Sequence, residues 1–199
     1  MLARLPHRQA RVGLLGGSFN PAHDGHRHIS HLAMRRLGLD RIWWLVSPQN
    51  PLKATTGMAS LESRLSRARS VAGRDRIDVS DLERELDTVY TVDTVRHLTM
   101  KLPHLKFVWV MGADNLAQVS EWQHWPFLFE SLPIAIFDRS TYARTALLSH
   151  ASRFFARSRR SARAADRLVY STPPAWVFVQ AGLHSESGTS LRCRGKWVC

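Results

Sequence analysis

Residues 16–26 of the chain read Gly16-Gly17-Ser18-Phe19-Asn20-Pro21-Ala22-His23-Asp24-Gly25-His26. An apolar run, residues 12–15, precedes this segment, and apolar residues recur at helical spacing after it, from Ile29 to Leu37. The pattern predicts a strand, a glycine-rich turn and a helix. Glycines let the main chain approach a phosphate closely, and the start of a helix offers free amide donors at its positive end. The two histidines share one side of the first helical turn, so the segment predicts an anion-binding cradle.

The same alternation of strand and helix continues along the chain. Further apolar runs predict strands at residues 42–46, 77–79, 107–111, 134–137 and 176–179. Between them, helical patterns cover residues 61–71, 92–102 and 126–132. We expect arginines on the outer face of the helix at residues 61–71. Thr91 should cap the helix at 92–102, and Pro126 should occupy the first position of the helix at 126–132.

Alternating strands and helices are typical of an α/β fold with a doubly wound parallel sheet, a Rossmann-like arrangement. In such a sheet, ligands bind beyond the carboxyl ends of the strands. The loops that follow residues 15, 46, 111 and 179 should therefore share one edge.

Composition and charge narrow the class of protein. With 199 residues, of which 44% are hydrophobic and 22% charged, the chain is typical of one globular domain. It contains no apolar run near the roughly 20 residues that span a bilayer, and the start lacks a signal-peptide core, so we expect a soluble cytoplasmic protein with no membrane partner. The two cysteines, Cys193 and Cys199, are too close together for a bridge to constrain the fold.

The formal net charge of +12 is concentrated in one segment. Residues 139–167 contain eight arginines and a single acid, Asp166. Within this segment, apolar residues from Leu147 to Phe155 recur at helical spacing, which predicts an amphipathic helix. We interpret the arginines as a solvated helix face and expect no nucleic acid as partner, although a basic nucleic-acid-binding module remains the alternative from another functional class.

The segment from Gly16 to His26 closely resembles the signature of the nucleotidyltransferase superfamily that carries a His-x-Gly-His motif. Four further stretches are similar to motifs of its nicotinate-nucleotide adenylyltransferase branch, in the same order. They are Ser47-Pro48-Gln49-Asn50-Pro51-Leu52-Lys53, Tyr90-Thr91-Val92-Asp93-Thr94, Gly112-Ala113-Asp114-Asn115 followed by Trp122, and Ser187-Gly188-Thr189-Ser190-Leu191-Arg192. The resemblance covers nearly the whole chain.

The resemblance implies that His23 and His26 are the catalytic residues and contact the phosphates of ATP. It also implies that a short C-terminal helical region, from about residue 187, closes on these phosphates, and that Asp114 lies near the adenosine ribose. The implied ATP-binding set is Gly16, Gly17, Ser18, Phe19, His23, His26, Gly112, Asp114, Ser187, Thr189 and Arg192.

For the acceptor, the resemblance implies that Trp122 stacks on the pyridine ring of a mononucleotide. The implied mononucleotide-binding set is Ser18, Asn50, Lys53, Thr91 and Trp122. Taken alone, a tryptophan is more often a packing residue, a lysine a surface charge and Asp114 a helix cap, so the order and spacing of the motifs carry these assignments.

The reaction that the family implies is adenylyl transfer from ATP to nicotinic acid mononucleotide, which gives deamido-NAD and pyrophosphate. Nothing in the sequence resembles a serine or cysteine nucleophile paired with a base. We therefore expect direct in-line attack on the α-phosphorus, with Mg²⁺ carried mainly by the ATP and no protein metal site. Other members of the superfamily act on nicotinamide mononucleotide, pantetheine phosphate or a cytidylyl acceptor, and these remain alternatives, as does assembly into a homo-oligomer.

Overall fold

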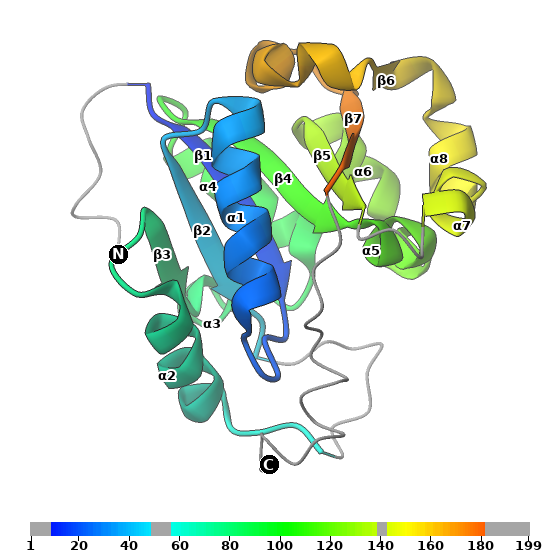
Figure 1. Ribbon diagram of the computed structural model, residues 1–199. Coiled ribbons are helices and arrows are strands. Elements are labelled where there is room, and N and C mark those ends of the chain that lie inside the picture. Colours follow the sequence, from blue (N-terminus) through cyan, green and yellow to red (C-terminus); the bar gives the residue numbers. More distant parts are fainter. Residues whose placement is uncertain (1–8, 49–56, 139–142, 182–199) are drawn as a thin grey trace.

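The computed structural model describes residues 9–48, 57–138 and 143–181. In this part of the chain, strands pair in the order β3-β2-β1-β4-β5-β7-β6, and each pairing is parallel (Figure 1). The strands are β1 (Arg11–Gly17), β2 (Arg41–Val46), β3 (Ile77–Ser80), β4 (Lys106–Gly112), β5 (Ile134–Asp138), β6 (Arg159–Arg160) and β7 (Trp176–Gln180). All six predicted strands are confirmed, and only the two-residue β6 was not expected.

The α-helices alternate with these strands. They are α1 (Asp24–Leu37), α2 (Leu61–Ala72), α3 (Leu82–Glu85), α4 (Thr91–Lys101), α5 (Ala113–Gln118), α6 (Trp125–Ser131), α7 (Ala143–Leu147) and α8 (His150–Phe154). The described residues also contain short 3₁₀ segments, of which the longest is η4 (Ala162–Tyr170). None of the helices in the three described ranges has the length and apolarity needed to cross a bilayer.

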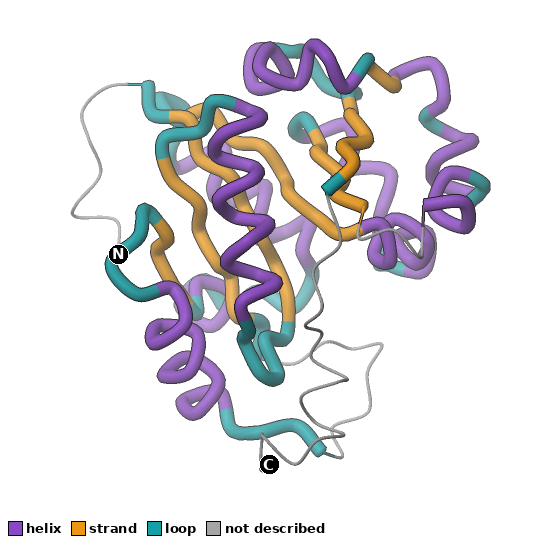
Figure 2. Tube along the Cα trace, in the orientation of Figure 1, coloured by secondary structure: helices purple, strands orange, loops and turns teal. Residues whose placement is uncertain are grey.

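Helices cover both faces of the sheet, as a doubly wound fold requires (Figure 2). On one face, Leu37 of α1, Leu65 of α2 and Leu168 of η4 belong to one hydrophobic cluster. On the other face, Val95 of α4 and Phe129 of α6 belong to a second cluster. The predicted α/β class is therefore confirmed.

The strand order reverses direction next to β1. The chain moves outward from β1 to β2 and β3, then returns to place β4 on the other side of β1, where Leu15 pairs with both Trp44 and Val110. At such a switch point, the loops that leave neighbouring strands diverge and open a crevice at their carboxyl ends. The glycine pair at the end of β1 lies at this crevice.

Helix α1 begins at the predicted motif and ends at Gly38. His23 is the N-cap, and Gly38 has a φ of 64°, the left-handed conformation that glycine adopts without steric cost. The stripe formed by Ile29, Ala33 and Leu37 is buried against the sheet. The helix therefore has its N-terminus, and both motif histidines, at the carboxyl edge of the strands.

Three local expectations need correction. Arg64, expected on the outer face of α2, is only 1% exposed, because it occupies the same helical stripe as Leu65 and Ala68. Tyr90 is the N-cap of α4, so Thr91 is the first residue inside the helix. Pro126 is the second residue of α6, which begins at Trp125.

The single helix predicted from Leu147 to Phe155 is wrong. The chain forms α7 and α8 there, because the Ser149 hydroxyl accepts a hydrogen bond from the Ser152 amide (3.3 Å) and so caps a new helix. Ala151 and Phe155 are buried as expected, whereas Phe154 is 61% exposed.

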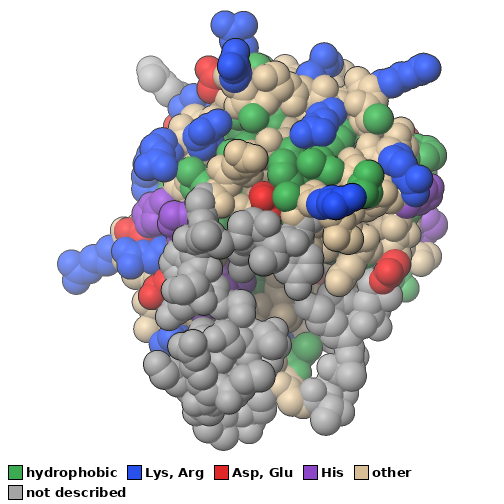
Figure 3. Space-filling model, turned by 45° about the vertical axis from the view of Figure 1, so that its right-hand side comes forward, with side chains coloured by type: hydrophobic (Ala, Val, Ile, Leu, Met, Phe, Trp, Pro, Cys, Tyr) green, Lys and Arg blue, Asp and Glu red, His purple; other side chains and the backbone are tan. Residues whose placement is uncertain are grey.

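The arginine-rich segment lies on the surface. Its seven described arginines, from Arg144 to Arg167, are all exposed. Figure 3 shows lysine and arginine side chains spread over the upper part of one face of the molecule, with neutral and apolar surface between many of them. The guanidinium of Arg159 lies 5.3 Å from the centre of the Trp176 ring, so this arginine also covers an aromatic side chain of β7.

Candidate active site

The loop after β1 is shaped by Phe19. Its φ of 46° is left-handed, a conformation that a bulky residue adopts only when its surroundings hold it there. The ring is 2% exposed, stacks on Trp44 with centroids 5.1 Å apart, and contacts the ring of His26 at 4.8 Å. Phe19 therefore bends the main chain within the motif loop, and its ring packs between Trp44 and His26.

The two motif histidines lie together and form a capping box at the N-terminus of α1. The His23 Nδ1 accepts a hydrogen bond from the Gly25 amide (3.1 Å), and the His26 Nδ1 accepts one from the His23 amide (3.3 Å). The ring centroids are 4.0 Å apart. Because Nδ1 is an acceptor in both rings, the neutral imidazoles carry their proton on Nε2. Both rings lie at the N-terminus of α1, and in each of them Nε2 is the donor atom of the neutral form.

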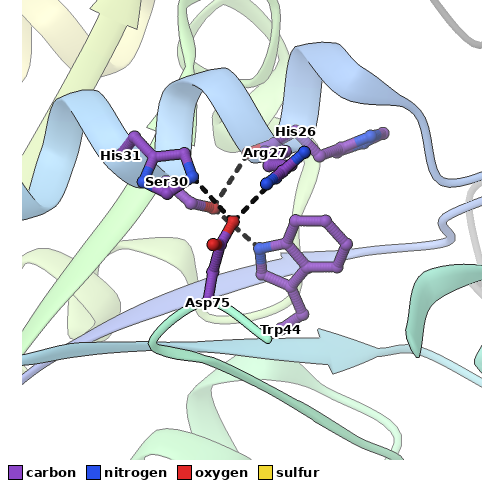
Figure 4. Close-up of polar contacts among 6 residues, drawn as sticks. All are labelled: His26, Arg27, Ser30, His31, Trp44 and Asp75. Atoms are coloured by element: carbon purple, nitrogen blue, oxygen red, sulfur yellow. Dashed lines mark hydrogen bonds and ion pairs between the residues drawn. The ribbon is translucent and has the colours of Figure 1, made fainter. Parts of the chain in front are cut away.

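A buried chain of hydrogen bonds connects the main chain of His26 to Trp44 of β2 (Figure 4). The indole Nε1 of Trp44 donates to the Ser30 hydroxyl (2.8 Å), which donates to the main-chain carbonyl of His26 (2.8 Å). Ser30 and Trp44 are fully buried, so both polar groups depend on this pairing. The indole that stacks on Phe19 therefore also positions the helical turn that carries His26.

The outer side of the same helix is held by Asp75. Its carboxylate accepts from Arg27 Nε (2.7 Å) and contacts His31 Nε2 (2.8 Å), which ties α1 to the loop between α2 and β3 (Figure 4). The hydrogen bond from Arg27, with a smaller contribution from His31, lowers the pKa of the Asp75 carboxyl.

A pocket of about 260 Å³ opens beside the motif loop at the carboxyl edge of the sheet. Five of its lining residues belong to the predicted site: Gly16, Gly17, Ser18, Thr91 and Trp122. The remaining lining residues are Ser47, Glu83, Val89, Tyr90, Trp109, Asn115, Glu121 and Gln123. The structure thus brings together residues from both predicted binding sets, which lie more than a hundred positions apart.

Gly16 is required where β1 meets the pocket. A Cβ at this position would lie 2.7 Å from Cη2 of Trp109, a residue of the neighbouring strand β4 that is itself only 2% exposed. At Gly17 a Cβ would make ordinary contacts with Phe19, at 3.6 Å. The first glycine of the pair therefore makes room for an indole, whereas a side chain at the second would make only ordinary van der Waals contacts.

Glu83 is one of several pocket residues that sequence reasoning did not find, and it is the buried carboxylate among them. It lies on the four-residue helix α3 and is 5% exposed. Burial raises the pKa of its carboxyl, and a hydrogen bond with the Ser47 side chain opposes that rise. Only its position seven residues before Tyr90, inside a short charged stretch, hinted at a place near the pocket.

The other predicted residues are placed as follows. Gly112 ends β4 and Asp114 lies in the first turn of α5, so both are at the same edge of the sheet, but neither lines the pocket. Outside the described residues lie Asn50, Lys53, Ser187, Thr189 and Arg192. Among the described residues, no group of three or more histidine, cysteine, aspartate or glutamate side chains is arranged to hold a metal ion.

The chain is similar to several known proteins over most of its length. A family model described as "Cytidylyltransferase-like" matches residues 14–190. A protein of Parvibaculum lavamentivorans named "Probable nicotinate-nucleotide adenylyltransferase" is 49% identical over 94% of this chain and 93% of its own. A protein of the same name from a Bradyrhizobium species is 48% identical over 92% of this chain and 95% of its own.

Among solved structures, the nicotinic acid mononucleotide adenylyltransferase of Plasmodium falciparum complexed with NaAD has a TM-score of 0.69. The match covers 92% of this chain and 83% of the other, at 14% identity, and so concerns the fold alone. Together with the sequence matches, the shared motifs and the common sheet lead to one conclusion. The chain belongs to the cytidylyltransferase-like family and to its nicotinate-nucleotide adenylyltransferases.

Proposed function

We propose that the imidazole pair and the adjoining pocket form one active site, which transfers the adenylyl group of ATP to nicotinic acid mononucleotide. The products are deamido-NAD and pyrophosphate. The observation that carries the assignment of the site is the pair of histidines whose Nδ1 atoms accept from main-chain amides, beside a pocket lined by Ser18, Thr91 and Trp122 of the predicted mononucleotide set. Because this reaction consumes ATP, we place it in the cytoplasm.

The chemistry requires an anion site next to an acceptor site. An oxygen of the mononucleotide's phosphate attacks the α-phosphorus of ATP, the bond from that phosphorus to the bridging oxygen breaks, and pyrophosphate leaves with the electron pair. Negative charge accumulates on the phosphoryl oxygens as this bond breaks. In our proposal His23 and His26 donate from Nε2 to these oxygens, and the positive end of α1 lies behind them.

We propose that the pocket holds the acceptor, with Trp122 stacked on the pyridine ring and Thr91 beside it, as the family resemblance implies. A ring of this kind gains from contact with a flat aromatic face. We propose that the substrate is the Mg²⁺ complex of ATP, because Mg²⁺ keeps several waters and binds phosphate oxygens readily.

A direct assay tests this function. The purified chain is incubated with Mg²⁺, ATP and either nicotinic acid mononucleotide or nicotinamide mononucleotide, and dinucleotide and pyrophosphate are measured by chromatography. We expect deamido-NAD and pyrophosphate in equal amounts, with the acid as the better acceptor. Faster turnover on the amide would assign the chain to a different acceptor, and no dinucleotide from either would contradict the proposal.

A further inference from the structure

Arg64 is a buried arginine that neither the motifs nor the proposed chemistry uses. It lies in the first turn of α2 and is 1% exposed, although arginine is almost never fully buried unless it is paired. Burial lowers the pKa of its guanidinium, and the Glu62 carboxylate opposes this effect. A guanidinium stays charged at neutral pH, so the fold holds a positive charge inside the protein at this point.

The partners of this charge are main-chain carbonyl oxygens. Arg64 Nε donates to the carbonyl of Ala59 (3.0 Å), just ahead of α2. Its Nη1 donates to the carbonyls of Ser18 (2.8 Å) and Ser47 (2.6 Å), and its Nη2 donates to that of Pro48 (2.7 Å). One planar side chain thus connects three segments: the motif loop after β1, the end of β2, and the residues that lead into α2.

Two of these segments contribute neighbouring residues to the lining of the pocket. Ser18 and Ser47 both line it, and the same nitrogen of Arg64 donates to the carbonyls of both. The Ser47 amide also donates to the Gly17 carbonyl (3.0 Å), which continues the pairing of β1 and β2 to the rim. Because a guanidinium is flat and its donors diverge at fixed angles, it sets the separation of the groups that it binds.

We propose that Arg64 is a positioning residue for adenylyl transfer, which holds Ser18 and Ser47 at the separation that the mononucleotide requires. This inference rests on the proposed function of the pocket. The guanidinium of Arg64 also places a positive charge next to two residues that line the pocket. This charge favours binding of a phosphorylated acceptor.

The test separates geometry from charge. Arg64→Lys keeps the charge, but an ammonium is a compact donor and cannot span carbonyls from three segments. We expect the Kd for nicotinic acid mononucleotide, measured by calorimetry at low temperature, to rise about tenfold or more, since small displacements of positioning groups are costly. The KM for the mononucleotide should rise with it, and kcat at saturation of both substrates should change less than threefold.

Arg67→Lys is the matched control, because Arg67 is an exposed arginine on the same helix. It should leave both constants unchanged. Arg64→Ala supplies a second measurement, in which millimolar methylguanidinium should lower the raised Kd, whereas it should have no effect on Arg67→Lys. Circular dichroism at the assay temperature establishes that each variant is folded.

Several outcomes overturn the proposal. One is an unchanged Kd for the mononucleotide in a folded Arg64→Lys protein. A second is a loss of kcat alone that follows the unfolded fraction of the protein. The third is failure of both Arg64 variants to fold at low temperature, which would make the role of Arg64 purely structural. Because the Kd is read without turnover, an unaltered protein that binds the mononucleotide but makes no dinucleotide would refute the proposed function and not the role of Arg64.

Discussion

The motif side of the molecule and the arginine-rich segment use polar residues in opposite ways. Around β1, α1 and α2, residues such as His23, Ser30 and Arg64 are buried, and each is held by main-chain or side-chain partners. In residues 143–170, every described arginine is exposed. The first region lost hydration and gained fixed geometry, whereas the second kept its charges in water, where their interactions are weak. In this protein, burial therefore distinguishes the polar residues that shape the site from those that only face the solvent.

The largest effect should come from the imidazole pair. Replacing His26 or His23 by alanine removes one prepared donor, and we expect kcat to fall roughly 10²- to 10³-fold by analogy with other anion sites. Steady-state rates at saturating ATP measure this. His104→Ala, which removes an exposed histidine in the loop before β4, should change kcat less than twofold. Near-normal turnover in either motif variant would remove that histidine from the mechanism.

The next effect concerns the glycine pair. Gly16→Ala places a methyl group against the buried ring of Trp109, and overpacking of this kind typically costs about 1–3 kcal/mol. Gly17→Ala meets only ordinary contacts and should cost less. Urea unfolding of the two variants compares them directly. Equal losses of unfolding free energy would mean that Trp109 moves aside freely and that the rim of the pocket is soft.

Glu83 gives a smaller effect, and it depends on pH. Its pKa is raised in the folded protein, so its contribution to stability is fully present below the unfolded pKa and is lost as pH rises through the folded pKa. Glu83→Gln cannot ionise. We expect the variant to gain stability relative to the unaltered protein as the pH rises from about 4.5 upward.

Thermal unfolding followed between pH 4 and pH 8 measures this difference. Glu130→Gln serves as the control, because Glu130 is an exposed carboxylate on α6. A difference between Glu83→Gln and the unaltered protein that stayed constant over the range, or shrank with rising pH, would contradict the raised pKa.

The smallest effect should come from the surface arginines. Arg157→Gln combined with Arg163→Gln removes two exposed charges, and surface changes of this kind usually alter unfolding free energy by less than about 0.5 kcal/mol. We expect kcat and both KM values to stay within twofold. A gel shift with duplex DNA at increasing salt tests the alternative function. Tight binding that weakens in the double variant would show that this surface has a nucleic-acid partner after all.

Much of the fold could be predicted because it depends on local pattern. The apolar runs that became β1, β2 and β4 are buried on both faces, and the glycine pair marks where the first of them ends. Since carboxyl ends of parallel strands meet at one edge, Ser18, Thr91 and Trp122 could be expected to converge.

Burial of charged residues could not be predicted in the same way. Arg64 was assigned to the outer face of its helix because arginine is usually exposed, although its spacing from Leu65 and Ala68 placed it on the buried stripe. Glu83 lies on a single helical turn, too short to show a period. In both cases the partners come from distant loops. The break at Ser149 was missed because apolar spacing continued through a residue that caps a new helix.

The pairing of β1 with β4 also has a consequence for a chain that is still being synthesised. Residue 15 lies directly against residue 110, so about half of the polypeptide must emerge from the ribosome before these strands can meet. Such non-local pairings form late and slowly. A nascent chain that ends before Trp109 has the histidine motif but lacks the indole ring that packs against Gly16. Nucleotide, by binding only the completed sheet, would then shift the folding equilibrium of finished chains and leave truncated ones unprotected from proteases.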